Sequence, residues 1–167
     1  MKKLPTWIEG DEFKLLIKHT LSKHHKMCFL LGFQSGLRVS EMVALQPENI
    51  DLDRRSIMIR DGKGGRDRVV PLPKSWSKDY IKMLPLKCGQ RSLQKAFESA
   101  AIRSKLKEKK PNMSIHKLRH GFAVRLINNG VPLNQVQLLM GHSAASTTSI
   151  YIHANPKDAL QNYERLF

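Results

Sequence analysis

The sequence predicts a single, mainly α-helical domain that carries one small antiparallel β-hairpin or sheet. The chain has 167 residues, which is long enough to bury a sizeable core in one domain. Apolar residues recur at helical spacing in most segments. Two short runs rich in Val and Ile, which are typical of strands, surround one glycine-rich loop. We find no internal repeat and no long linker, so we expect residues 1–167 to form one domain.

Three helices are predicted before the strands. Residues 10–21 carry their apolar side chains mainly on one face. Residues 25–36 are almost entirely apolar, which predicts a central helix that ends at Gly36. Residues 38–47 predict a short third helix, because Pro47 stops it.

The remainder of the chain predicts a hairpin followed by more helices. The glycine-rich sequence DGKGGRD joins the two strands. The clearest amphipathic pattern is the apolar stripe of Leu118, Phe122 and Leu126. In chain order, the predicted elements are strands at 56–60 and 68–72 and helices at 90–106, 114–130, 133–141 and 156–167.

The chain is strongly basic. It has 29 Lys and Arg residues against 14 Asp and Glu residues, a formal net charge of +15. Such an excess suggests a polyanionic partner, which is more often nucleic acid than a membrane surface. Affinity for nucleic acid should then fall steeply with salt, because each phosphate contact releases counterions. A protein that is merely basic is the alternative at this point.

Several function classes lack their motifs in this sequence. The longest apolar run, 27–33, is too short to span a bilayer, and the first residues lack the apolar stretch of a signal peptide. No zinc-binding pattern is present, so we expect no metal. The sequence GKGG at 62–65 lacks the spacing of an NTPase phosphate loop. Cys28 and Cys88 form no disulfide framework, which suits a reducing cytoplasm.

Several side chains are suited to phosphate chemistry. His116 and Arg119 lie three apart on a predicted helix and therefore share a face. Arg38 stands at a helix start, where its fork could hold a phosphate, and Glu41 lies one turn further on as a partner. Lys63 lies in the glycine-rich loop, from which it could reach a phosphate or a leaving oxygen. Taken singly, these positions also fit solvated surface residues or a weak surface ion pair.

Tyr151 follows a loop of small residues and lies nine positions after His142. The flanking Ile150 and Ile152 can anchor it. Taken alone, Tyr151 also fits a packed aromatic residue with no chemical role. Its importance depends on the other candidates, which stand in one order along the chain: Arg38, Lys63, His116-x-x-Arg119, Gly141-His142 and Tyr151.

This constellation closely resembles the catalytic domain of the tyrosine recombinases, the phage integrase and Xer-type site-specific recombinase family. The matching segments are SGLRVSEMVAL, GKGGRDRVVPL, HKLRHGFAVRLINNG and LLMGHSAASTTSIYIH. In that family a tyrosine hydroxyl attacks a DNA phosphodiester, which forms a 3′-phosphotyrosyl link and releases a 5′-hydroxyl. A 5′-hydroxyl then attacks this link and rejoins the DNA. The link stores the bond energy, so the resemblance implies no cofactor, neither ATP nor metal.

The resemblance implies a role for each matching residue. Tyr151 would be the nucleophile, and Arg38 and Arg119 would clamp the non-bridging oxygens and offset their growing charge. His116 would help to deprotonate the tyrosine or hydrogen-bond the phosphate, and His142 would donate a hydrogen bond to it.

The other implied roles are supporting. Lys63 would protonate the departing 5′-oxygen, and Glu41 would hold Arg38. Arg66 and Arg68 flank the loop and could contact backbone phosphates, although a solvated role is equally compatible with the sequence.

The chain departs from the family pattern in two places. The N-terminal helical domain that closes around DNA in family members is expected to be absent from 1–167, and the match over 73–113 is poor. The helix at 156–167 has an apolar stripe that could pack in cis or dock on a neighbouring protomer. The resemblance implies double-stranded DNA and other protomers, in a tetramer, as partners.

Two other functions stay open from the sequence. The chain could be a non-catalytic DNA-binding modulator of a full-length recombinase, or a type IB topoisomerase that relaxes DNA. The complete set of six Arg, Lys, His and Tyr residues argues against the first, because a binder does not need them all. The sequences GLRVSE and LRHGFA argue against the second.

Overall fold

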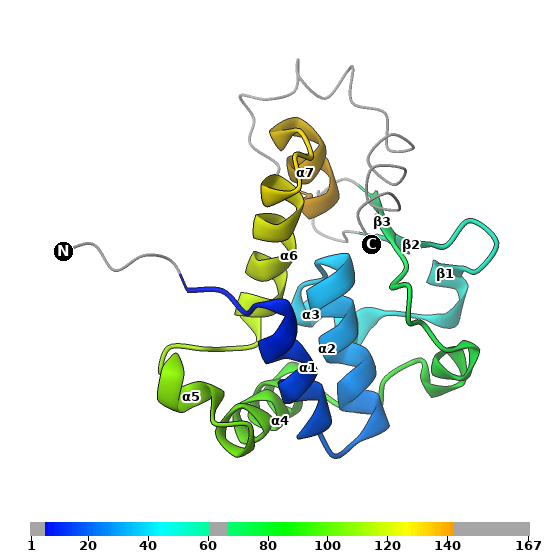
Figure 1. Cartoon of the computed structure of the whole chain (residues 1–167). Helices are drawn as coiled ribbons and strands as arrows, with labels where there is room; N and C mark the ends of the chain where they lie inside the picture. Colours follow the sequence, from blue (N-terminus) through cyan, green and yellow to red (C-terminus); the bar gives the residue numbers. More distant parts are fainter. Residues whose placement is uncertain (1–5, 61–66, 142–167) are drawn as a thin grey trace.

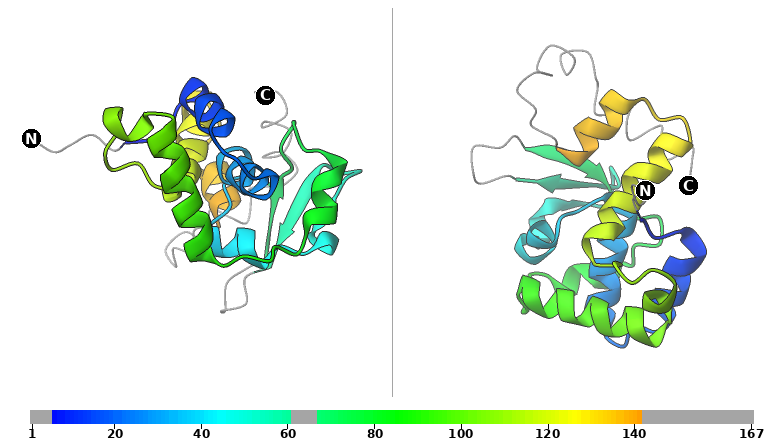
Figure 2. Two further views of the ribbon diagram at one scale, coloured as in Figure 1. Left: turned by 90° about the horizontal axis from the view of Figure 1, so that it is seen from below. Right: turned by 90° about the vertical axis from the view of Figure 1, so that its left-hand side faces the viewer.

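The computed structural model describes residues 6–60 and 67–141 of the chain. It confirms the predicted class, because helices build most of this part and its three short strands form one antiparallel sheet. The sheet flanks the helical body in Figure 1 and in the left view of Figure 2. The elements are α1 (Gly10–Lys18), α2 (Lys23–Ser35), α3 (Val39–Ala44), η1 (Pro47–Asn49), β1 (Ile50–Asp51), β2 (Ser56–Ile59), β3 (Arg68–Pro71), η2 (Lys78–Met83), α4 (Gln90–Arg103), α5 (Leu106–Lys109), α6 (His116–Asn128) and α7 (Leu133–Met140).

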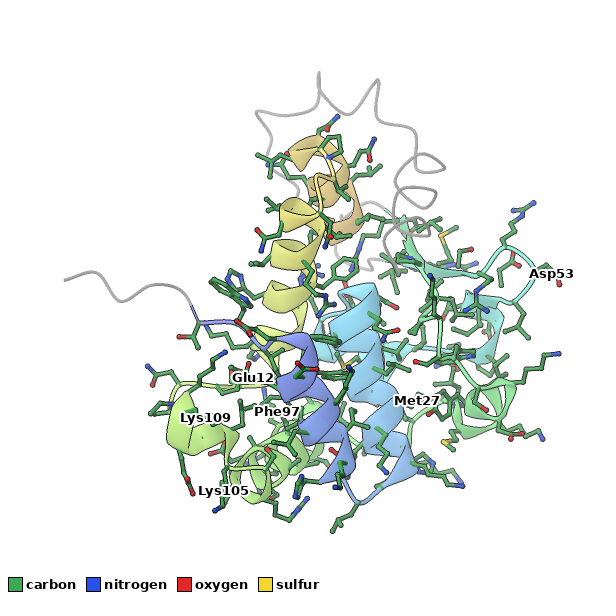
Figure 3. The ribbon with its side chains drawn as sticks, viewed as in Figure 1. Glu12, Met27, Asp53, Phe97, Lys105 and Lys109 are labelled. Carbon is green, nitrogen blue, oxygen red and sulfur yellow. The ribbon has the colours of Figure 1, made fainter. Side chains whose placement is uncertain are left out.

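Helix α2 is central, as its almost entirely apolar sequence predicts. It packs against α1, α3, α4 and α6. Its Phe29 meets Phe97 of α4 edge-on, with 5.4 Å between the ring centroids, and its Phe33 stacks on Phe13 of α1 at 3.9 Å. Figure 3 shows Phe97 inside the helical body, whereas Lys105 lies at the rim. The buried aromatic rings therefore hold α1, α2 and α4 together.

Helix α6 joins two apolar clusters. Leu118 belongs to the main core around α2, whereas Phe122 and Leu126 pack with Val136 and Leu139 of α7. All three residues of the predicted stripe are fully buried, so that prediction is confirmed. Because α6 spans both clusters, it joins α7, which also contacts β3, to the main helical body.

The sheet has the order β1-β2-β3, and the predicted hairpin is its β2–β3 pair. Ile57 pairs with Val70, and Ile59 pairs with Arg68. Strand β1 was not predicted, because two residues are too few to show an alternating pattern. Figure 2 shows the end of α7 next to these strands, and β3 contacts α7.

The helices predicted at 38–47 and 90–106 end earlier in the structure than expected. Helix α3 ends at Ala44 rather than at Pro47, and Pro47 instead begins η1. The proline disfavours helical backbone at the residue before it, which explains the early end. The helix predicted at 90–106 breaks where Lys105 adopts a positive φ of 58°. Within the described residues, no helix is both long and apolar enough to cross a membrane.

We predict that Gly36→Ala destabilises the fold more than Gly130→Ala does. Both glycines have positive φ, +69° and +82°, so alanine meets the same backbone strain at both. At Gly36 a Cβ would also lie 2.5 Å from Cδ1 of Phe122, whereas at Gly130 it would meet nothing within 4 Å. We expect a loss in unfolding free energy of about 1–2 kcal/mol at Gly130 and roughly 1–3 kcal/mol more at Gly36.

Urea denaturation of the two variants and the parent protein measures this difference. Equal losses for the two variants would show that Phe122 does not confine Gly36.

Candidate functional site

The carboxylate of Glu41 is the point at which several predicted site residues meet. Glu41 is the third residue of α3, and Arg38 precedes the first turn of this helix. The backbone N–H of Arg38 donates to Oε2 of Glu41 at 2.7 Å, and Nη1 of Arg38 donates to Oε1 at 3.1 Å. The expected pairing of Arg38 with Glu41 is therefore present. The same carboxylate therefore caps the N-terminus of α3 and holds the guanidinium of Arg38.

Arg68 differs from its prediction. Its side chain is only 5% exposed, so the solvated role is wrong for this residue. Its Nη1 and Nη2 donate to the two carboxylate oxygens of Glu41, each at 2.7 Å, and its Nε donates to the carbonyl of Leu139 at 2.9 Å. The guanidinium is therefore turned inward onto α3 and α7, and a contact of Arg68 with a DNA phosphate stays a prediction. A buried arginine must find such partners, since an unpaired buried charge is very costly.

Arg119 links the ends of two helices. It lies on α6, and its side chain is 12% exposed. Its Nη1 donates to the carbonyl of Gly36 at 2.6 Å, and its Nη2 donates to the carbonyl of Met140. Gly36 caps the C-terminus of α2, and Met140 is the last residue of α7. Carbonyls at helix C-termini lack helical partners and carry partial negative charge, so they suit a guanidinium.

These contacts leave Arg38 as the most accessible arginine of the set. Its side chain is 42% exposed, although Glu41 is only 13% exposed. Arg119 also lies near the carboxylate, with 3.9 Å between its Nη1 and Oε2 of Glu41. A guanidinium carries five N–H donors, so the bonds of Arg38 and Arg119 do not exhaust either group.

A pocket of about 290 Å³ brings Arg38, His116 and Arg119 together. Arg38 comes from the start of α3, and His116 and Arg119 come from the first turn of α6, where their spacing puts them on one face. The side chain of His116 is exposed. The predicted neighbourhood of these three residues is therefore present. The lining residues are Leu37, Arg38, Val39, Ser40, Gln90, Ile115, His116 and Arg119.

The electrostatics of the site follow from three guanidinium groups around one carboxylate. Burial alone raises the pKa of Glu41, but hydrogen bonds from Arg68 and the Arg38 backbone, together with the charges of Arg68 and Arg119, outweigh it and hold this pKa below its ordinary value. Burial, and next the positive charges of Arg38 and Arg68, lower the pKa of Arg119 to about 10. Both groups are therefore charged at neutral pH, and the pocket is a positive site.

Such a pocket is suited to a tetrahedral oxyanion. Two guanidinium groups converge on it from α3 and α6, and an imidazole stands at its rim. Guanidinium forks bind phosphate oxygens with charge-assisted hydrogen bonds. Because Glu41 and helix-end carbonyls hold these groups, little reorganisation is needed when charge develops on a bound phosphate.

Four predicted site residues lie outside the described residues: Lys63, Arg66, His142 and Tyr151. Their roles, and the helix predicted at 156–167, stay predictions. Their places in the chain are nevertheless informative. Lys63 and Arg66 belong to the segment that joins β2 to β3, and His142 directly follows Gly141, the C-terminal cap of α7.

Two features of the site were not predicted. Gln90, the first residue of α4, lines the pocket from a region where the family resemblance is poor, and its sequence context carries no signal for this position. The second feature is the burial of Arg68, for which the sequence did contain a signal. Val70 and Leu72 are buried, and an alternating strand pattern puts Arg68 on their side of β3.

We predict that Glu41→Gln lowers thermal stability at pH 7 and that this loss shrinks in acid. The folded-state pKa of Glu41 is depressed, so its stabilising contribution is present above the unfolded-state pKa of about 4.3 and is lost as pH falls through the folded-state pKa. At pH 7 we expect a cost of roughly 3 kcal/mol, because the variant leaves Arg68 without its counter-charge.

Melting temperatures of the parent and the variant, measured between pH 7 and pH 3, check this prediction. Glu48→Gln is the matched control, because Glu48 is an exposed residue on the neighbouring η1. A difference between parent and Glu41→Gln that stays constant over this range would contradict the paired carboxylate.

Known proteins are similar to this chain over most of its length. The chain matches the model of the phage integrase family over residues 6–88 and 84–158. It is 34% identical over 169 residues to the tyrosine recombinase XerA of Thermococcus kodakarensis, which covers 90% of this chain and 58% of that protein. The chain thus spans less than two thirds of the length of this relative.

Solved structures agree with this assignment. The integrase from mycobacterium phage Brujita superposes with a TM-score of 0.72 at 26% identity, over 100% of this chain and 60% of that one. The XerH site-specific recombinase, solved with a palindromic difH substrate as a post-cleavage complex, superposes with a TM-score of 0.68 at 26% identity, over 90% of this chain and 50% of that one. Because the family model spans nearly the whole described part, with both arginines and the histidine of the pocket, this chain belongs to the phage integrase family.

Proposed function

We propose that this protein cuts and rejoins DNA strands at specific sites through a covalent 3′-phosphotyrosyl intermediate. One observation carries the proposal: Arg38, His116 and Arg119 line one positive pocket in which Glu41 and helix-end carbonyls hold the arginines. A binding protein needs cations on its surface, where they are hydrated. It does not need two guanidinium groups that protein partners hold in one pocket.

In the proposed reaction, the scissile phosphate lies between Arg38 and Arg119. The hydroxyl oxygen of Tyr151 attacks the phosphorus, and its proton passes to His116 or to water through it. The bond from phosphorus to the 5′-oxygen breaks, and Lys63 donates the proton that this oxygen takes up. The two arginines stabilise the charge on the non-bridging oxygens, and His142 donates a further hydrogen bond. Religation is the same sequence in reverse, with an incoming 5′-hydroxyl.

Double-stranded DNA is the proposed substrate. The net charge of +15 supports it, and the similar XerH structure is a complex with a palindromic difH substrate. Assembly of several protomers on the DNA, in a tetramer, and action in the cytoplasm are part of this proposal. Sedimentation of the DNA complex formed by the Tyr151→Phe variant counts the protomers.

We predict that the protein forms a denaturant-stable adduct with a nicked suicide DNA and that Tyr151→Phe abolishes it. The substitution removes only the attacking oxygen, so DNA binding should stay nearly unchanged. Denaturing gels detect the adduct, and an electrophoretic shift measures binding. An adduct that survives in Tyr151→Phe would overturn Tyr151 as the nucleophile. If the parent forms no adduct with any of several DNAs that it binds, the function is that of a non-catalytic binder.

We also predict that Lys63→Ala slows cleavage by about 10²–10⁴-fold on ordinary DNA, the range of general acid catalysis. The loss should be much smaller on DNA with a 5′-bridging sulfur at the scissile position, because a thiolate leaves without a proton. Single-turnover rates on both substrates measure the two losses. Equal losses would remove Lys63 from the general-acid role.

A further inference from the structure

Arg68 is the least exposed of the three arginines around Glu41, and the reaction proposed above gives it no task. It does not line the pocket with Arg38 and Arg119. Its guanidinium instead makes three hydrogen bonds inside the protein, two to the Glu41 carboxylate and one to the carbonyl of Leu139. Burying a charged guanidinium costs free energy even when it is hydrogen-bonded, so the groups that Arg68 binds indicate its role.

The first partner is the carboxylate that holds Arg38. Both oxygens of Glu41 accept from Arg68 at 2.7 Å, while Arg38 Nη1 lies at 3.1 Å and Arg119 Nη1 at 3.9 Å. The shorter, bidentate contact is the stronger one. Arg68 therefore supplies most of the counter-charge for Glu41. Without it, the carboxylate would be satisfied by Arg38 and Arg119 alone, and it would compete with a phosphate for them.

The second partner is the end of α7. Besides the bond to Leu139, the side chain of Arg68 packs so closely on Gly141 that a Cβ there would lie 2.8 Å from its Cδ. Gly141 directly precedes His142, and Arg68 itself begins β3, two residues after the segment 61–66 that contains Lys63. One side chain thus ties together the described ends of the two segments that carry the remaining predicted catalytic residues.

We propose that Arg68 is a positioning residue. It neutralises Glu41 so that Arg38 and Arg119 stay available to the scissile phosphate, and it joins the start of β3 to the end of α7. This inference rests on the proposed function. It goes beyond that function because it assigns to a residue outside the pocket the charge balance of the two phosphate-binding arginines.

The test compares Arg68→Met with the double variant Glu41→Gln, Arg68→Met. In the single variant the carboxylate keeps its charge and takes up Arg38 and Arg119, so we expect adduct formation at saturating nicked DNA to slow by about 100-fold, similar to the loss of one transition-state donor. In the double variant that competing charge is gone, and we expect the rate to recover by about tenfold. A role in packing alone would give no recovery, because the second substitution removes one more hydrogen-bonding partner.

Two controls accompany this cycle. Arg54→Met removes an exposed arginine of the β1–β2 turn, 85% exposed and paired with Asp51, and should cleave at the parental rate. Circular dichroism melts of all variants ensure that rates are compared below every melting temperature. Arg68→Lys keeps the charge but lacks the fork, so we expect its rate to fall between those of the parent and of Arg68→Met.

The outcomes separate this inference from the proposed function. If the parent protein forms no adduct, the proposed function fails. If the parent forms the adduct and a folded Arg68→Met forms it at the same rate, or if the double variant is as slow as the single one, then Arg68 has no positioning role and the proposed function stands.

Discussion

The geometry of the pocket depends on one carboxylate that serves three arginines. Glu41 accepts hydrogen bonds from the backbone N–H and the side chain of Arg38 and from both Nη atoms of Arg68. It also forms an ion pair with Arg119. These groups come from α3, β3 and α6, which lie far apart in the sequence. A single carboxylate offers about four lone-pair directions, which is enough to hold several donors at fixed angles. The relative positions of these three elements at the site therefore depend on the placement of Glu41.

Helix ends supply the other anchors. Arg119 donates to carbonyls at the C-termini of α2 and α7, and Arg68 donates to a second carbonyl at the end of α7. These carbonyls need partners in any case, because no further turn of helix follows them. The same bonds thus satisfy the helix termini and hold the guanidinium groups. Burial of Arg119, together with the positive charges of Arg38 and Arg68, lowers its pKa to about 10, and Arg119 stays charged at neutral pH.

Helix α6 is fastened to α2 along several turns, which keeps Arg119 in place. Phe122 lies against Gly36, so closely that only a glycine fits there. Six residues beyond Arg119 on the same helix, Arg125 stacks over the ring of Phe33 and donates to its carbonyl. Phe33 in turn stacks on Phe13 of α1. Packing and hydrogen bonds thus reinforce each other at the α2–α6 contact, and the pocket lies at the starts of packed helices.

Much of this protein follows from its sequence alone. Periodicity is local, so the central position of α2, the buried stripe of α6 and the β2–β3 hairpin could all be predicted. The spacing of His116 and Arg119 put them on one face, and the order of the six candidate residues indicated the family.

The sequence did not predict strand β1, which is too short, or the break at Lys105, which depends on a single backbone angle. That Arg68 joins Arg38 as a partner of Glu41, and that it also bonds the end of α7, was decided only by the tertiary structure. The physical reason is that strand alternation indicates the buried face of β3 but not the partners that a buried charge needs. The carboxylate of α3 and the end of α7 come from distant parts of the chain, and together they make burial of the Arg68 charge possible.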